Sequence, residues 1–335
     1  MRNLPFSTSV FADVFCLLML PAGAQTKKTT RPVSISIILD TDIGPDYDDA
    51  GAMAMLHAMA DNGECRILAT IASNKHPRIA ATLDVINTYF GRPDIPVGVP
   101  KSAGVNLPAA QGWDSVITAK YPHNLKTNAQ AADAVSLYRQ LLARQPDRSV
   151  TIVTIGFLTN MADLWQSKAD RFSALAGKDL IRQKVKRLVC MAGKFPVGTE
   201  FNVEKDAAAS KIVFDNWNTP IVFSGFEIGE KVFTGIPLIQ SDIQKSPVKD
   251  VYDISIPKGG AEDKNGRMSW DQTAVLVAVR GLEKFYTVKP GRFVCRADGS
   301  NAWNPAGKGH LYLVEKMPVP EITKIINGLM MHQPK

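Results

Sequence analysis

The chain has 335 residues, of which 45% are hydrophobic and 21% are charged, proportions that are ordinary for a soluble globular protein. Its net charge of +7 comes from basic residues that are scattered along the sequence, with only short clusters at "TKKTTR" and "KVKR". A nucleic-acid groove needs basic residues gathered on one surface. The composition therefore favours a solvated surface and predicts no nucleic-acid partner.

The N-terminal segment has the three parts of a secretory signal peptide. It begins with a basic "MRN", continues with an apolar stretch over residues 10–20 that Asp13 interrupts, and reaches a small-residue "AGA" at 22–24. This pattern predicts a signal peptide over residues 1–24. The remaining cysteines fit neither a zinc pattern nor a disulfide framework, which agrees with a bacterial periplasm. No other run approaches ~20 apolar residues, so no membrane span is expected, and a lipid anchor at Cys16 stays as a minor alternative because a convincing lipobox is lacking.

Short apolar runs alternate with longer helical patterns over the rest of the chain. The expected strands cover residues 33–39, 66–71, 97–99, 150–155, 187–191, 220–223 and 310–314. The expected helices cover residues 48–60, 78–90, 130–144, 160–166, 205–216 and 273–282. Most of the strands are continuously apolar, as in parallel sheets that are covered on both faces. We therefore predict one α/β domain over residues 33–332, with an open, mostly parallel, doubly wound sheet and helices on both faces.

Two segments depart from this alternation. Residues 101–128 have no sustained periodicity and are expected to form a long surface loop or lid. Near the C-terminus, "RFVCRADGSNAW" predicts a small β-hairpin that turns at Asp298 and Gly299.

An unusual density of acidic residues follows the first expected strand. The segment "ISIILDTDIGPDYDDAGAMAML" places Asp40, Asp42, Asp46, Asp48 and Asp49 within ten positions. In open parallel sheets, ligands bind at the carboxyl ends of the strands, where these side chains would converge. A hard divalent cation would relieve their repulsion, and oxygen ligands favour Ca²⁺ or Mg²⁺ over Zn²⁺. The sequence therefore predicts a metal site, with a solvated acidic turn as the alternative.

Six segments together resemble the inosine-uridine-preferring nucleoside hydrolase family. They occur in the family's order over nearly all of the chain after the signal segment: "LDTDIGPDYDDAGA", "TIASN", "DIPVGVP", "TIVTIGFLTNMADL", "GTEFNVEKDAAAS" and "SWDQTAVL". Three residues separate Gly44 from the paired aspartates, where most members have one, and this spacing resembles an exported bacterial branch. The resemblance implies an enzyme that hydrolyses the N-glycosidic bond of ribonucleosides to free base and ribose.

The resemblance also implies a Ca²⁺ site and a catalytic base. Its ligands would be Asp42, Asp49 and Asp271 with the backbone carbonyl of Ile155, and Asp42 would take the proton of the attacking water. Cleavage of such a bond passes through a sugar with oxocarbenium character, as in glycoside hydrolysis. Asp40 is expected to support the ligands from behind, and both a solvated and a catalytic role stay open for Asp46.

Further positions match substrate-binding residues of the family. The expected contacts to the sugar and base are Asp48, Asn74, Met191, Lys194, Glu200, Asn202 and Trp270. Trp270 stands where many members have His, which resembles a purine-preferring branch, and a core-packing role is its alternative. Lys194 stands where Asn is frequent and would reach a 5′-hydroxyl or an anionic group. Three residues of the expected lid, Trp113, Tyr121 and His123, are candidates to complete the base pocket.

Some positions have a simpler structural interpretation. Thr159 and Asn160 are expected to cap a helix, and Asp206 to begin the next one. Two other functions also stay open: a phosphatase of the haloacid-dehalogenase type, because "ILDTDIG" resembles its nucleophile loop, and a catalytically silent periplasmic nucleoside- or sugar-binding protein that keeps the metal site. The expected partner is a small nucleoside, and by family analogy the chain would form a homodimer or homotetramer.

Overall fold

The computed structural model describes residues 1, 4 and 34–334. The predicted signal peptide therefore lies outside the described residues except at positions 1 and 4. Contacts group residues 34–334 into one compact unit. Within the described part of the chain, no helix combines the length and the apolar character needed to cross a membrane.

A single large sheet organises the described residues. Its strand order is β4-β3-β2-β1-β5-β6-β8-β13-β11-β12-β7, and a separate pair joins β9 and β10. The strands are β1 (Ile35–Thr41), β2 (Cys65–Ala72), β3 (Val97–Val99), β4 (Ala132–Asp133), β5 (Val150–Thr154), β6 (Val185–Met191), β7 (Val197–Gly198), β8 (Ile221–Ser224), β9 (Phe233–Thr234), β10 (Arg267–Met268), β11 (Tyr286–Cys295), β12 (Asn301–Asn304) and β13 (His310–Glu315). The strands from β4 to β13 in this order pair in parallel, and those from β11 to β7 are antiparallel. This arrangement confirms the predicted mostly parallel α/β fold.

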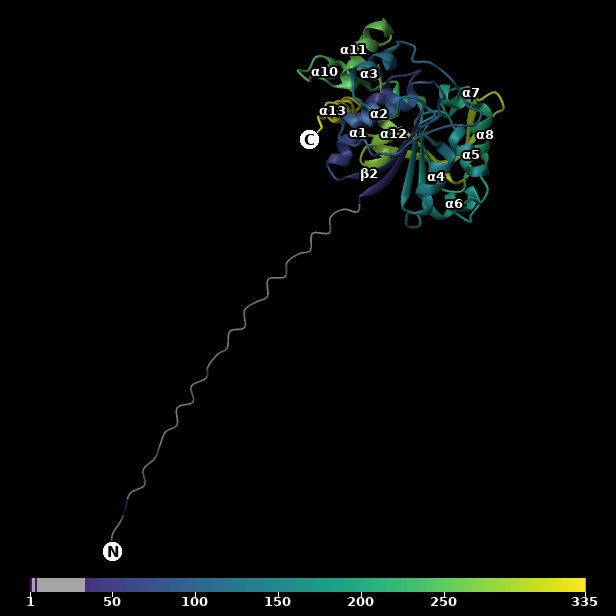
Figure 1. Cartoon of the computed structure of the whole chain (residues 1–335). Helices are drawn as coiled ribbons and strands as arrows, with labels where there is room; N and C mark the ends of the chain where they lie inside the picture. Colours follow the sequence, from purple (N-terminus) through teal and green to yellow (C-terminus); the bar gives the residue numbers. More distant parts are fainter. Residues whose placement is uncertain (2–3, 5–33, 335) are drawn as a thin grey trace. The chain divides into compact units, whose positions relative to one another are not determined.

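Helices cover both faces of the sheet (Figure 1). They are α1 (Asp48–Asp61), α2 (Ile79–Tyr89), α3 (Trp113–Lys120), α4 (Ala134–Ala143), α5 (Thr159–Gln166), α6 (Gly177–Lys184), α7 (Phe201–Lys205), α8 (Ala207–Asn216), α9 (Phe226–Gly229), α10 (Ile236–Ile239), α11 (Pro247–Gly259), α12 (Trp270–Arg280) and α13 (Val319–Met330). Two apolar cores result because successive strand side chains point to opposite faces. Ile37 and Leu39 join the core under α1 and α12, while Ile38 joins the core under α4 and α5.

The strand order changes direction at β1. From β1 the chain builds outward through β2 and β3 on one side, and later returns to add β5 and β6 on the other. Loops after β1 and β5 therefore diverge and leave a crevice at the carboxyl ends of these strands. Asp40 pairs with Thr154 in the register of β1 and β5, so the acidic loop and the segment beginning at Ile155 start side by side.

The region predicted to be a lid contains a helix, and α6, α11 and α13 are also absent from the expected elements. Residues 113–120 form α3, because Trp113 and Ile117 lie one turn apart and are both fully buried. Only these two apolar anchors mark the helix, too few for a periodic signal. The predicted hairpin is confirmed: β11 pairs with β12, and Gly299 occupies the turn with φ of +81°, a conformation that favours glycine.

Candidate active site

The acidic loop and the β5 segment are held together by their backbones. The amide of Ile155 donates to the carbonyl of Asp40 at 2.8 Å. Next to it, Gly156 packs so closely that an added Cβ would collide with the backbone nitrogen of Asp42 and lie 2.7 Å from the Ser73 hydroxyl. A residue without a side chain is therefore required where the two loops meet.

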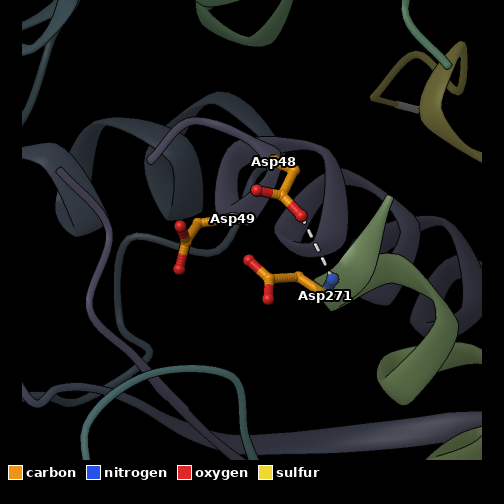
Figure 2. Close-up of side chains that lie close together, drawn as sticks. All are labelled: Asp48, Asp49 and Asp271. Carbon is orange, nitrogen blue, oxygen red and sulfur yellow. Dashed lines mark hydrogen bonds between the residues drawn. The ribbon is translucent and has the colours of Figure 1, made fainter. Parts of the chain in front are cut away.

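Two helix N-termini bring carboxylates to this crevice. Asp48 and Asp49 occupy the first turn of α1, Asp271 occupies the first turn of α12, and the two helices pack against each other. Figure 2 shows the three side chains turned toward one another, with the Asp271 amide donating to Asp48 Oδ2 at 3.1 Å. One oxygen from each lies within 4.8 Å of the others, and all three residues are buried. The positive ends of the helix dipoles favour negative charge here.

One cavity collects most of the predicted site residues. Its lining includes nine of them: Asp42, Asp48, Asp49, Ile155, Met191, Glu200, Asn202, Trp270 and Asp271. The trio with mutually close oxygens contains Asp48 where the predicted ligand set has Asp42, although Asp42 lines the same cavity. Segments that are more than 200 residues apart in the sequence thus contribute carboxylates to one pocket.

These carboxyl groups are costly to keep ionised. Burial raises the pKa values of Asp42, Asp48 and Asp271 well above the usual range, and repulsion from neighbouring carboxylates raises them further. Burial also raises the pKa of Asp49 to about 7, although its hydrogen bond from the Thr41 hydroxyl opposes the shift.

A hard divalent cation fits this group of residues. Asp49 Oδ2 is buried and has no hydrogen-bond partner in the structure. The surrounding donors are carboxylate oxygens, with the Ile155 segment alongside. Oxygen donors without thiolate or imidazole are the set that Ca²⁺ and Mg²⁺ prefer.

Asp40 lies outside this cavity, on the opposite face of β1. Its Oδ2 accepts hydrogen bonds from Tyr138 Oη at 2.8 Å and Asn160 Nδ2 at 2.9 Å. Asn160 also donates to the carbonyl of Ala72 at 2.7 Å, and Thr159 donates to Asp206. The predicted capping role of Thr159 and Asn160 is therefore wrong, because both side chains connect α5 to other segments.

Asp206 accepts from the amide of Ala209 at 3.4 Å and caps α8, as expected from its position before that helix.

The Glu200–Asn202 segment forms one wall of the cavity. Glu200 caps α7 and accepts from the backbone amides of Asn202 at 2.8 Å and Gly193 at 3.0 Å. Burial raises its pKa to about 7. Asn202 Nδ2 lies 3.3 Å from the carbonyl oxygens of both Ile155 and Met191, so this amide is positioned beside the predicted carbonyl ligand.

Two predicted substrate contacts do not line the cavity. Asn74 is fully buried, and its amide bonds to the carbonyls of Asp42 at 3.2 Å and Leu107 at 2.8 Å, which ties the acidic loop to the next segment. Lys194 is exposed, with its Nζ 4.7 Å from the ring centroid of Phe226, a cavity residue. Lys194 therefore lies beside the cavity and contacts it through that ring.

The aromatic candidates from the predicted lid lie elsewhere. Trp113 is fully buried in the core, Tyr121 donates to Asp250 at 2.8 Å, and His123 Nδ1 lies 2.8 Å from the Tyr121 carbonyl. The cavity instead contains Phe201 and Phe226, whose ring lies 5.2 Å from that of Trp270. The "EFN" motif pointed to the neighbours of Phe201, but no local pattern marked Phe226.

Arg267 is the functional candidate that sequence reasoning missed. It lines the cavity and forms an ion pair with Asp46, a residue 221 positions away in the chain. Asp46 thus has a structural partner and is only part-exposed. Only the fold brings these two residues together, so the sequence carried no signal for the pair.

Comparison with known proteins agrees with this geometry. The model of the family "Inosine-uridine preferring nucleoside hydrolase" matches residues 37–304. The chain belongs to this family. It is an enzyme of the nucleoside hydrolase class, which acts on the N-glycosidic bond of ribonucleosides.

Relatives within the family differ in their named specificity. An inosine-uridine preferring nucleoside hydrolase of Leishmania major is 28% identical over 231 residues, 64% of this chain and 67% of the relative. A pyrimidine-specific ribonucleoside hydrolase of a Shewanella strain (ANA-3) is 33% identical over 208 residues, 58% of this chain and 60% of the relative. The family therefore does not decide which base this nucleoside hydrolase prefers.

Solved structures show the same fold. A plant nucleoside hydrolase superposes with a TM-score of 0.69 at 19% identity, covering 89% of this chain and 99% of that one. A purine-preferring ribonucleoside hydrolase from Gardnerella vaginalis gives a TM-score of 0.69 at 18% identity, covering 88% and 99%.

Proposed function

We propose that this nucleoside hydrolase cleaves purine ribonucleosides to free base and ribose in a Ca²⁺-dependent reaction. The observation that carries the proposal is the convergence of Asp42, Asp49 and Asp271 with the Ile155 segment in one buried cavity. These residues would hold the cation, and Asp48 lies within reach of the same point. When bound there, Ca²⁺ supplies positive charge that offsets the carboxylates, binds sugar hydroxyls and makes water more acidic.

The protein's own residues would carry the rest of the reaction. Asp42 takes a proton from the attacking water, whose oxygen forms a bond to C1′ of the ribose. The bond between C1′ and the base breaks, its electron pair leaves with the base, and solvent protonates the base. Asp48 accepts a hydrogen bond from a ribose hydroxyl, and the Asn202 amide donates one to the ribose. The Met191 side chain packs beneath the sugar ring. The buried wall excludes bulk water from the developing charge.

Aromatic residues on the cavity wall support a purine preference. Trp270 and Phe226 lie 5.2 Å apart with their planes at 33°, and Phe201 lines the same cavity. Trp270 is held by its indole N–H, which donates to the Phe226 carbonyl at 2.9 Å. A purine offers a larger ring face than a pyrimidine for packing against such a wall.

A nucleoside panel tests this proposal. The purified protein with Ca²⁺ is incubated with inosine, guanosine, adenosine, uridine and cytidine, and released reducing sugar is measured. We expect purine ribosides to react fastest and Asp42→Asn to lose at least about 100-fold in kcat, as for removal of a general base. The matched control Asp215→Asn changes an Asp that pairs with Lys211 on the surface of α8 and should stay active. Uridine turnover above that of inosine would refute the purine preference, and activity in excess chelator would refute the Ca²⁺ dependence.

Export and assembly belong to the same proposal. The signal-like segment over residues 1–24 supports secretion to the periplasm. Cell fractionation followed by N-terminal sequencing should find the protein outside the cytoplasm and lacking this segment. Light scattering after gel filtration should give the mass of a dimer or tetramer, and a monomer would refute the assembly.

A further inference from the structure

Arg267 is the only basic residue among the described residues that line the active-site cavity. It lies on β10, opposite Thr234 of β9, and precedes Trp270 and Asp271 by three and four residues. The segment 267–271 therefore supplies a cation, an aromatic ring and a carboxylate to the same wall. Asn202 and Met191 line another part of this wall, next to the Ile155 carbonyl, where the ribose is proposed to bind.

The guanidinium group of Arg267 is held in a fixed orientation. Its Cζ lies 5.0 Å from the ring centroid of Tyr47 and 5.0 Å from that of Trp270. Nη2 donates to Asp46, and Nη1 lies 3.5 Å from Asp263, which also accepts from the Tyr47 hydroxyl at 2.7 Å. The side chain is only 12% exposed. A planar donor that is fixed on two rings and two carboxylates is preorganised for recognition.

The charges around Arg267 indicate what it can bind. Besides Asp46 and Asp263, carboxylate oxygens of Glu262 and Asp48 lie 3.7 and 3.9 Å from the guanidinium group. This excess of negative charge disfavours a phosphate or carboxylate ligand. The Arg267 Nε–H is buried and makes no hydrogen bond in the structure, so a neutral acceptor would satisfy a donor that is otherwise unpaired.

We propose that Arg267 and Asp46 determine base specificity by recognising the edge of a 6-oxopurine. This inference rests on the proposed function. The unpaired Nε–H of Arg267 donates to O6 of the base, and Asp46 accepts from N1–H. Adenine presents an amino donor at C6, which would face the Arg267 donor, and an acceptor at N1, which would face the Asp46 carboxylate. Neither position could form a hydrogen bond with this pair. Ribosides of hypoxanthine and guanine are therefore the preferred substrates.

The same contact assists the leaving base. When the bond between C1′ and N9 breaks, the electron pair passes to the base and its negative charge spreads to N7 and O6. A cationic donor at O6 stabilises that charge before solvent protonates the base, while Arg267 keeps its own protons. Water supplies the oxygen that binds C1′, and its proton passes to Asp42.

The test compares substrates that differ at single atoms. The full chain with Ca²⁺ is assayed with inosine, adenosine and purine riboside, which lacks O6, using the native protein, Arg267→Gln and Arg267→Lys. We expect Arg267→Gln to lower kcat/KM for inosine by about 10- to 100-fold, the value of one hydrogen bond from a charged donor, and to change kcat/KM for adenosine and purine riboside less than about threefold. Arg267→Lys, which keeps the charge but loses the Nε–H and the planar group, should resemble Arg267→Gln.

Arg280→Gln is the matched control. Its guanidinium group pairs with Glu64 at 2.7 and 2.8 Å near the other end of α12, so all substrate ratios should remain as in the native protein. An equal loss for all three nucleosides in the Arg267 variants, or no loss, would overturn the proposal. If the Arg267 variants fail to fold, the Asp46→Asn variant tests the proposal instead. It should abolish the preference for inosine over 1-methylinosine, and a retained preference would overturn the proposal.

A further arm separates this inference from the proposed function. If the native protein releases no ribose from any nucleoside, the proposed hydrolysis is refuted, and calorimetry with free hypoxanthine and adenine still tests Arg267. Tighter binding of hypoxanthine that is lost in Arg267→Gln would support recognition of the 6-oxo edge. Equal affinities for the two bases would refute it.

Discussion

Replacing the buried His57 with Gln should make this nucleoside hydrolase less sensitive to acid. His57 lies on α1, the helix whose first turn carries Asp48 and Asp49, and it is fully buried. Its Nε2 lies 3.1 Å from Asn87 Oδ1, its Nδ1 lies 3.5 Å from Arg92 Nη1, and its ring stacks on Phe90. The neutral tautomer with hydrogen on Nε2 satisfies both contacts, whereas a protonated ring would face the arginine.

The size of the effect follows from proton linkage. Burial lowers the pKa of His57 from 6.5 to about 3, and the charges of Arg92 and His332 add to this while Asn87 and Asp61 oppose it. Below pH 6.5 the unfolded chain binds a proton at His57 and the folded chain does not. The free energy of unfolding is therefore highest above that pH and declines as the pH falls toward 3. A pH of about 5 lies about 1.5 units below the pKa of the unfolded chain, and each unit costs about 1.4 kcal/mol, so the free energy of unfolding falls by about 2 kcal/mol.

Urea unfolding of both proteins in saturating Ca²⁺, at about pH 7.5 and about pH 5, measures this difference. The variant Gln can still donate to Asn87, and its packing loss is the same at both values. On acidification the native protein should therefore lose about 2 kcal/mol more than His57→Gln. Phe90→Leu is the control, because it removes the stacked ring and no titratable group. Parallel pH profiles for the native protein and His57→Gln would refute the assignment of a neutral buried histidine.

Three further predictions concern the active site and its support. Gly156→Ala should reduce kcat/KM by at least about 100-fold, because the added methyl group displaces Asp42; a folded variant with native kinetics would contradict the close packing. Ca²⁺ at about 100 times its Kd should stabilise the protein by about 2.7 kcal/mol and raise its melting temperature. Asp271→Asn should abolish most of this rise, and an unchanged rise would exclude Asp271 as a ligand. Tyr138→Phe should cost about 1–3 kcal/mol in urea unfolding, because buried Asp40 loses a donor; a neutral effect would show that water replaces the hydroxyl.

Local signals in the sequence predicted the parts of the fold that depend on local interactions. Two aspartates at its start and "NG" at its end placed one helix at 48–60, and α1 covers Asp48–Asp61. The other expected site helix began at 273, whereas α12 begins at Trp270 and places Asp271 in its first turn. α3 was missed because Trp113 and Ile117 are its only fully buried apolar residues.

The site divides in the same way. The motifs predicted the acidic residues that line the cavity, because each motif is a continuous stretch of sequence that can be recognised by itself. The Arg267–Asp46 pair and the packing of Arg267 on Trp270 join segments through tertiary structure, and neither residue has a local pattern that requires the other. Asn160 illustrates the converse error: a helix-start position suggested a cap, but buried Asp40 offered its side chain a stronger acceptor.

The balance of charge in the cavity supports the proposed cation. Arg267 and the N-termini of α1 and α12 are the positive features beside the acidic residues in the described structure. Asp46 and Asp263 already occupy the guanidinium group, and a helix terminus offers only about half an elementary charge. The charges of the buried residues Asp42, Asp49 and Asp271 are therefore only partly compensated by the protein itself. A fully protonated cluster would remove the repulsion but also the proposed base, Asp42, whereas the proposed divalent cation would offset the charge and leave Asp42 ionised.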